Sequence, residues 1–205
     1  MSDDSLHKSA IVIDGLVVSN WSRQVFEDMH RGGLTAANCT CSIWEGLRET
    51  MINIAQWKKA FLDHADIIMQ VRSAEDIHRA KQLNKVGIIL GWQNTSAIED
   101  RLDLLPLFKD IGVGVIQITY NTQNLVGSGC WEPNDSGLSG FGREVITEMN
   151  RLGILIDLSH VGPKTSADAV TFSKRPCAYT HVAPFSAFNN SRNKTDQQLK
   201  EIIAS

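Results

Sequence analysis

Residues 137–181 read GLSGFGREVITEMNRLGILIDLSHVGPKTSADAVTFSKRPCAYTH, an alternation of helix and strand patterns. In residues 140–151 apolar side chains recur at the intervals of one helix face. They are Phe141, Val145, Ile146 and Met149, with Leu152 just beyond. Gly153 follows as a helix stop signal, and the apolar run 154–158 is typical of a strand buried on both faces. The stretch therefore predicts a helix that leads directly into a buried strand.

A histidine stands at the end of this strand, and another stands at the end of the next one. His160 follows residues 154–158, Pro163 can open a second helix, and the strand pattern 177–180 ends at His181. In a parallel β/α barrel the carboxyl ends of the strands form the catalytic face. Neutral imidazoles on neighbouring strand ends can share one metal ion. The same positions also suit histidines that only hydrogen-bond the rim of the sheet.

The same alternation extends over the rest of the chain. Further strand patterns are expected at 11–18, 34–41, 86–92 and 113–120. Helical patterns are expected at 24–30, at 44–69, after the capping residue Ser73, at 98–108, and at 196–204 after Thr195. Six repeats without a break in composition predict one parallel α/β domain over residues 11–205, preceded by a polar tail at 1–10.

The number of repeats points to an incomplete (β/α)8 barrel of TIM type. Such a barrel closes with eight strands and typically needs about 250 residues. Six units in 205 residues leave two units unaccounted for, and the chain stops just after a helical pattern. We therefore expect a truncated barrel whose open strand edges favour self-association. An open, doubly wound sheet is the structural alternative.

Composition narrows the class of protein. Apolar residues make up 42% and charged residues 21% of the chain, which is ordinary for a globular protein, and the net charge of −3 gives no general attraction to nucleic acid or acidic membranes. The four cysteines lack zinc-finger spacing, and the first ten residues are not a signal peptide. We expect a cytoplasmic protein with free thiols, no membrane association and no nucleic-acid partner.

Three features carry a resemblance to a known family. They are GLSGFGREVITEMNRLGILIDLSHV, the strand-end His181, and SRN at 191–193. Together they resemble the membrane (renal) dipeptidases, zinc-dependent members of the amidohydrolase-like barrels. The resemblance implies a (β/α)8 barrel that hydrolyses dipeptides at two bridged zinc ions. It also implies that His160 and His181 bind one zinc ion and that Arg192 contacts the substrate carboxylate, a role that suits its paired donors.

Other positions depart from the family pattern. Where the family has His-x-Asp after its first strand, this chain has Leu16 and Val18, which cannot bind a metal. Gln93 stands in place of a bridging Glu, and Tyr120 in place of a substrate-contacting His. A further family Asp, on the eighth strand, would lie beyond residue 205. These replacements predict a degenerate site with one divalent metal ion, zinc, or none.

Two functions follow from this pattern. The first is a metallo-dipeptidase-like hydrolase that cleaves a dipeptide or similar small amide with metal-activated water. The second is a non-catalytic barrel of the same family that binds a small molecule at its mouth. Either function uses a polar pocket for a dipeptide or other small molecule, formed by Gln93, Tyr120, Asn121 and Arg192. A third reading makes the chain one piece of a larger assembly that supplies the remaining strands.

Overall fold

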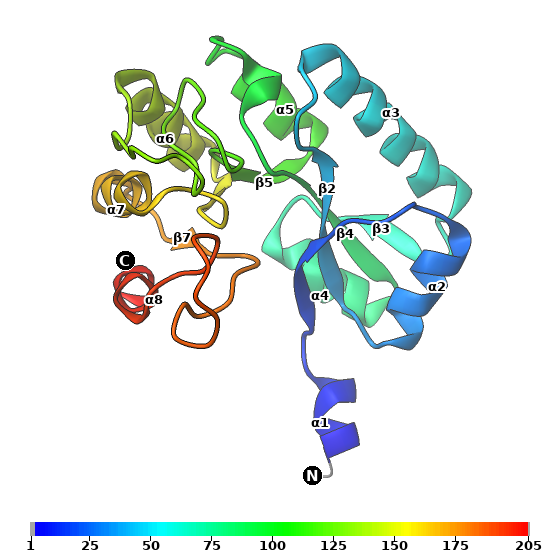
Figure 1. Ribbon diagram of the computed structural model, residues 1–205. Coiled ribbons are helices and arrows are strands. Elements are labelled where there is room, and N and C mark those ends of the chain that lie inside the picture. The colour runs from blue at the N-terminus through cyan, green and yellow to red at the C-terminus, as the bar shows by residue number, and fades with distance from the viewer. Residues whose placement is uncertain (1–2, 205) are drawn as a thin grey trace.

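The computed structural model describes residues 3–204, in which a curved parallel sheet is surrounded by helices (Figure 1). Six strands follow one path in the order β1-β2-β4-β5-β6-β7, and β3 pairs with β4 beside that path. The strands are β1 (Ile13–Val17), β2 (Ala36–Ser42), β3 (Ile68–Gln70), β4 (Val86–Trp92), β5 (Val113–Gln117), β6 (Leu155–Asp157) and β7 (Cys177–Ala178). Every pairing is parallel, so the predicted incomplete α/β barrel is confirmed.

The helices form the outer layer, and α5 to α8 lie side by side along one half of the sheet (Figure 1). They are α1 (Asp3–Ser9), α2 (Arg23–Arg31), α3 (Leu47–Asp63), α4 (Ala74–Gln82), the 3-10 turn η1 (Ser96–Ile98), α5 (Leu104–Ile111), α6 (Gly140–Leu152), α7 (Pro163–Phe172) and α8 (Asp196–Ile203). The core lies between this layer and the sheet. There the ring of Trp92 in β4 meets the ring of Phe108 in α5 edge-on, with centroids 4.4 Å apart.

The curvature of the sheet brings its two ends together. Gly15 in β1 lies so close to the carbonyl of Thr180, just past β7, that a Cβ atom on Gly15 would be 2.2 Å from the Thr180 oxygen. In the strand order these two segments are at opposite ends. A flat doubly wound sheet would hold them far apart, so this contact supports the half-barrel and excludes the open-sheet alternative.

Several predicted helix boundaries are confirmed by local geometry. Ser73 and Asp76 form a capping box at α4, and Thr195 forms another with Gln198 at α8. Gly153 ends α6 in a left-handed conformation with φ of 67°, which a residue without Cβ adopts at little cost. Pro163 opens α7. These signals act over three or four residues, so sequence alone is enough to place them.

One strand was missed, because the expected helix at 44–69 overlaps its first two residues. The helix α3 ends at Asp63, and the chain returns through β3, whose Ile68 is buried against β4. The sequence between these elements has neither Gly nor Pro, so nothing local separates the end of the helix from the start of the strand.

The expected helix at 98–108 was also wrong in its first half. The turn η1 is followed by Glu99, whose φ of +52° is incompatible with a continuing helix, and α5 begins only at Leu104. Ile98 and Leu105 are both buried, so tertiary packing favours the break. The expected tail likewise contains α1, and His7 on α1 is hydrogen-bonded to the carbonyl of Gly32.

Residues 118–139, between β5 and α6, form a long loop that is fixed to neighbouring elements. The Asp135 carboxylate accepts hydrogen bonds from the amides of Lys164 and Thr165 at the start of α7. The amide of Cys130 donates to the carbonyl of His160 at 2.9 Å. The loop is therefore held against the ends of β6 and α7, where the two histidines lie.

The state of the cysteines and the character of the helices were also expected from the sequence. All four cysteines are free and buried, as expected of apolar fillers. Within residues 3–204, none of the helices combines the length and the apolar character needed to cross a bilayer.

Candidate functional site

The two predicted ligands lie together on one rim of the sheet. His160 follows β6 and His181 follows β7, and their Nε2 atoms are 3.0 Å apart. The opposite nitrogen of each ring has a partner of its own. Nδ1 of His160 is 2.6 Å from Oδ1 of Asn121, and Nδ1 of His181 is 2.7 Å from Oγ1 of Thr180. Each imidazole is thus held at Nδ1 and directs Nε2 toward the other ring.

A buried carboxylate organises the His181 side of the pair. Asp157 is the last residue of β6 and is only 1% exposed. Its Oδ1 accepts hydrogen bonds from the amide and hydroxyl of Ser159, at 2.9 and 2.5 Å, and from the amide of Thr180 at 3.3 Å. Its Oδ2 accepts the hydroxyl of Thr180 at 2.7 Å. The amide of His181 donates to the Ser159 hydroxyl, which in turn donates to Asp157. Asp157 therefore holds the backbone of His181 through Ser159 as well as the side chain of Thr180.

The hydrogen-bond network assigns the same tautomer to both imidazoles. A carboxylate can only accept, so the single hydroxyl proton of Thr180 goes to Asp157, and the Thr180 oxygen must accept from Nδ1–H of His181. Oδ1 of Asn121 is also an acceptor, which places the proton of His160 on Nδ1. Both Nε2 atoms therefore present lone pairs to each other.

With these tautomers the two facing lone pairs, 3.0 Å apart, repel unless a proton or a metal ion lies between them. Two nitrogens bound to one tetrahedral zinc ion, each about 2.0–2.1 Å from it, are about 3.3 Å apart. Metal-binding histidines usually donate the other ring N–H to an oxygen, as both rings do here. The histidine pair thus fits two ligands of one metal ion.

Burial keeps both imidazoles in the neutral form that binds metal. Removal from water is the main cause that lowers the pKa of His160, and the positive charge of Arg192 lowers it further. The pKa of His181 is lowered by burial as well, although the charge of Asp157 opposes this effect. Metal ions therefore compete with few protons at neutral pH.

These shifts predict that the metal-free protein loses stability in acid. Below about pH 6.5 the histidines of the unfolded chain take up protons that the folded chain does not, so the free energy of unfolding falls as pH falls. Each such histidine contributes a slope of up to about 1.4 kcal/mol per pH unit. Urea denaturation at several pH values, with chelator present, should show this slope. In His181→Asn the slope should be smaller by up to about 1.4 kcal/mol per pH unit, the contribution of one proton. An unchanged slope would contradict the lowered pKa of His181.

Aromatic rings support the other histidine. Tyr120 stacks on His160 with ring centroids 4.1 Å apart and an interplanar angle of 25°. Trp44, in the loop before α3, meets Tyr120 edge-on at 4.8 Å and remains 59% exposed. A phenol ring thus packs against the imidazole of His160 where the family pattern has a histidine.

Two cations lie beside the histidine pair. Arg192 donates from Nη1 to the carbonyl of Ser159 at 2.5 Å and from Nη2 to that of His181 at 2.7 Å. Lys194 is 1% exposed, donates to the carbonyl of Val161 at 2.6 Å, and has its pKa lowered to about 8 by burial. Within residues 3–204 neither cation is paired with a carboxylate. Sequence reasoning identified Arg192 but missed Lys194, because a lysine in a polar loop gives no sign that it is buried.

The remaining predicted positions offer few metal donors. Gln93, at the end of β4, is 3% exposed, and its backbone oxygen accepts a hydrogen bond from Gln117. No hydrogen bond within residues 3–204 joins its side chain to the histidines. Leu16 and Val18 carry no donor atoms. In the same part of the chain, no three His, Cys, Asp or Glu side chains gather as a metal site. The residues therefore do not fit a dinuclear centre, but they fit a single ion held by two histidines and further ligands.

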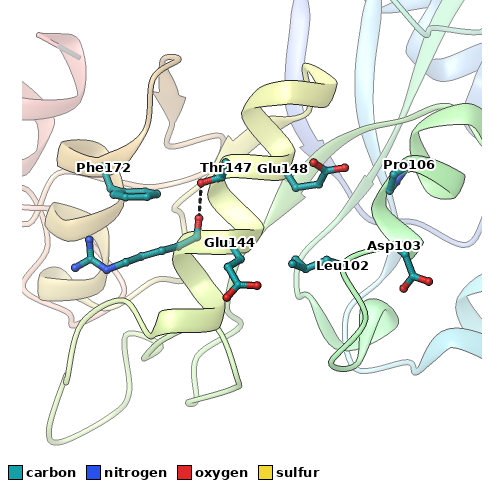
Figure 2. A pocket seen from close by; sticks show the side chains of 8 residues that line it. Leu102, Asp103, Pro106, Glu144, Thr147, Glu148 and Phe172 are labelled. Carbon is teal, nitrogen blue, oxygen red and sulfur yellow. Dashed lines mark hydrogen bonds between the residues drawn. The ribbon is translucent and has the colours of Figure 1, made fainter.

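Two surface pockets lie outside this pair. One, of about 580 Å³, is bounded by α5, α6 and α7 on the outer surface, with Leu102, Glu144 and Phe172 in its wall (Figure 2). The other, of about 560 Å³, lies past the ends of β1 and β2 and includes Val18 and Trp21. The second is on the same rim as the histidines, at the position where the family pattern places its first metal ligands.

Comparisons with known proteins identify the family of this chain. The sequence profile described as "Membrane dipeptidase (Peptidase family M19)" matches residues 19–205. An uncharacterized dipeptidase of Schizosaccharomyces pombe is 30% identical over 161 residues, which are 76% of this chain and 39% of that protein. Dipeptidase tcpJ of Claviceps purpurea is 28% identical over 158 residues, which are 76% of this chain and 37% of that protein. The chain thus spans about two fifths of the length of these curated relatives.

Solved structures show the same fold. An amidohydrolase from Pseudomonas aeruginosa is 51% identical and superimposes with a TM-score of 0.97, over 100% of this chain and 62% of that one. A metallo peptidase from Rhodobacter sphaeroides, solved with a phosphinate mimic of the dipeptide L-Ala-D-Ala, is 19% identical with a TM-score of 0.83, over 95% of this chain and 71% of that one. At that identity the second likeness concerns the fold alone. The profile match covers nearly the whole domain, and the chain therefore belongs to the membrane dipeptidase family.

Proposed function

We propose that this chain carries the histidine half of a metal-dependent hydrolase that cleaves dipeptides or similar small amides. In this proposal one divalent ion, zinc, is held by His160 and His181. The observation that carries it is the 3.0 Å approach of the two Nε2 atoms, with Nδ1 of each ring held by a neighbouring oxygen. Two Nε2 atoms directed toward one another can bind one metal ion between them. The dipeptidase relatives supply the reaction class.

The chain's own residues have separate roles in this proposal. A bound divalent ion supplies polarisation of the scissile carbonyl and activation of water. His160 and His181 hold the ion, and Asn121 fixes the ring of His160. Arg192 uses two of its five N–H donors on backbone carbonyls, which leaves donors for a substrate carboxylate. Tyr120 and Gln93 shape the mouth of the site beside them.

A second candidate is a non-catalytic barrel that binds a small molecule at the same mouth. The replacements at Leu16, Val18 and Gln93 favour it, because they remove one metal's own ligands together with the bridging carboxylate. The buried Oε1 of Gln117, which has no hydrogen-bond partner in the described chain, is a further polar group near the end of β5. In this reading Gln93, Tyr120, Asn121 and Arg192 bind the ligand without metal.

Zinc titration of chelator-treated protein distinguishes the two candidates. The hydrolase proposal predicts about one zinc ion per chain, with an affinity below that of a complete dinuclear site because two protein ligands leave coordination positions open. The zinc-loaded protein, joined to the strands that would complete its barrel, is then assayed against a panel of L,L- and L,D-dipeptides and N-acyl amino acids. Release of free amino acid supports hydrolysis. Stoichiometric zinc without cleavage, or no zinc at all, would favour the binding barrel.

A further inference from the structure

Asp157 is the only carboxylate that the network connects to the histidine pair within residues 3–204. Its Oδ2 is 3.7 Å from Nδ1 of His181, too far for a direct hydrogen bond. The hydroxyl of Thr180 lies between them, 2.7 Å from each. A hydrogen-bonded link from the carboxylate to the ring therefore passes through that hydroxyl.

We propose that Asp157 is a positioning residue that sets the tautomer of His181 through Thr180 and so keeps Nε2 free to bind a metal ion. The inference rests on the proposed function, because the proposed metal ion needs the lone pair that this tautomer leaves on Nε2 of His181. The tautomer itself is a property of the metal-free protein. It can therefore be tested whether or not the proposed function is correct.

The direction of two hydrogen bonds carries the argument. Thr180 has one hydroxyl proton and three neighbours that could take it. The Asp157 carboxylate and Nδ1 of His181 are each 2.7 Å away, and the Ser159 hydroxyl is farther, at 3.3 Å. An ionised carboxylate has no proton to give, so it takes the proton of Thr180, and His181 must then be protonated at Nδ1. Without an obligate acceptor at Oδ2, Thr180 could donate to His181 instead. The imidazole would then carry its proton on Nε2, where no lone pair remains for a metal ion.

The substitution Asp157→Asn should reverse this chain of hydrogen bonds. The amides of Ser159 and Thr180 both donate to Oδ1, so the amide oxygen of the variant must stay at that position. The amide nitrogen then replaces Oδ2 and donates to the Thr180 oxygen. Thr180 would turn its proton toward Nδ1 of His181, and the ring would move its own proton to Nε2. The change removes one charge and almost no volume.

The test measures the tautomer of His181 in metal-free, 15N-labelled protein at neutral pH by long-range 1H–15N correlation spectra. The proton is expected on Nδ1 in the native protein and on Nε2 in Asp157→Asn. Zinc affinity should fall by about 10- to 100-fold in that variant, the usual effect of losing an outer partner of a metal ligand. Asp76→Asn is the matched control, because its carboxylate also accepts backbone amides but lies at α4, away from the histidines.

A second pair of variants tests the same step if Asp157→Asn fails to fold. Thr180→Val removes the hydroxyl at nearly constant volume and should lose the Nδ1–H signal, whereas Thr180→Ser keeps the hydroxyl and should retain it. His181 that stays protonated at Nδ1 in Asp157→Asn, or equal zinc affinity in Thr180→Val and Thr180→Ser, would overturn the inference. If the native protein binds no zinc but the tautomer responds as expected, the proposed function fails and this inference stands.

Discussion

His160→Ala or His181→Ala should each abolish measurable zinc binding by the chelator-treated protein. Each variant removes one of the two histidine nitrogens that face the site within residues 3–204, and the remaining imidazole cannot hold an ion alone. Loss of an outer hydrogen-bonding partner already weakens metal sites by about 10- to 100-fold, so loss of a direct ligand should exceed about 100-fold. Isothermal titration with zinc would show heat for the native protein and none for either variant.

Two controls separate ligand loss from general damage. His78→Ala changes an exposed histidine on α4 and should leave zinc binding unchanged, which shows that the signal is not adventitious surface binding. Leu16→Ala changes a position where the family pattern has a metal ligand but this chain has none, and it too should bind zinc normally. Tight zinc binding that survives His181→Ala, or two ions per native chain, would mean that the metal site lies elsewhere.

Gly15→Ala should strongly destabilise the fold and also weaken the histidine site. Its new Cβ atom would lie 2.2 Å from the carbonyl oxygen of Thr180, so backbone must move. Displacing β1 would break the hydrogen bond from Asn38 to the Gly15 carbonyl, and displacing Thr180 would disturb the group that holds His181. Overpacking of this kind costs about 1–3 kcal/mol or more, equivalent to a fall in Tm of about 2–10 °C.

Thermal unfolding and zinc titration of Gly15→Ala would measure both effects. Gly140→Ala is the matched control, because a Cβ atom there meets nothing within 4 Å and the position is the first residue of α6. That control should be neutral or slightly stabilising, since alanine restricts the unfolded chain. A Tm for Gly15→Ala equal to that of Gly140→Ala would show that the close approach of β1 to Thr180 does not exist in solution.

The site was predictable where its members stand at the ends of strands. His160 and His181 each follow an apolar run, and parallel strands bring such ends to one rim, as the structure confirms. The roles of His160 and His181 in metal binding, and of Arg192, Tyr120, Gln93 and Asn121 in substrate binding, stay predictions. Lys194 was missed because its burial depends on how the loop after β7 folds back onto β6, which no local pattern encodes.

The sequence alone determined most of the elements of this protein and the order in which they alternate. Helix caps at Ser73 and Thr195, the glycine stop at Gly153 and the buried strand runs all depend on contacts within a few residues. The strand β3 escaped detection because its three residues depend on pairing with β4 for their conformation, and their own pattern continues that of the helix before them. Local signals fix elements only where the determining contacts are local.

Tertiary structure was needed for the chemistry of the histidine pair. The tautomers depend on Asn121, which is 39 residues from His160, and on Asp157, which reaches His181 through a hydroxyl on the next strand. The contact of Gly15 with Thr180 likewise exists only because the sheet curls. Hydrogen-bond direction depends on differences of a few tenths of an ångström in the distances between segments that are far apart in the chain. Strand register and sheet curvature set these distances.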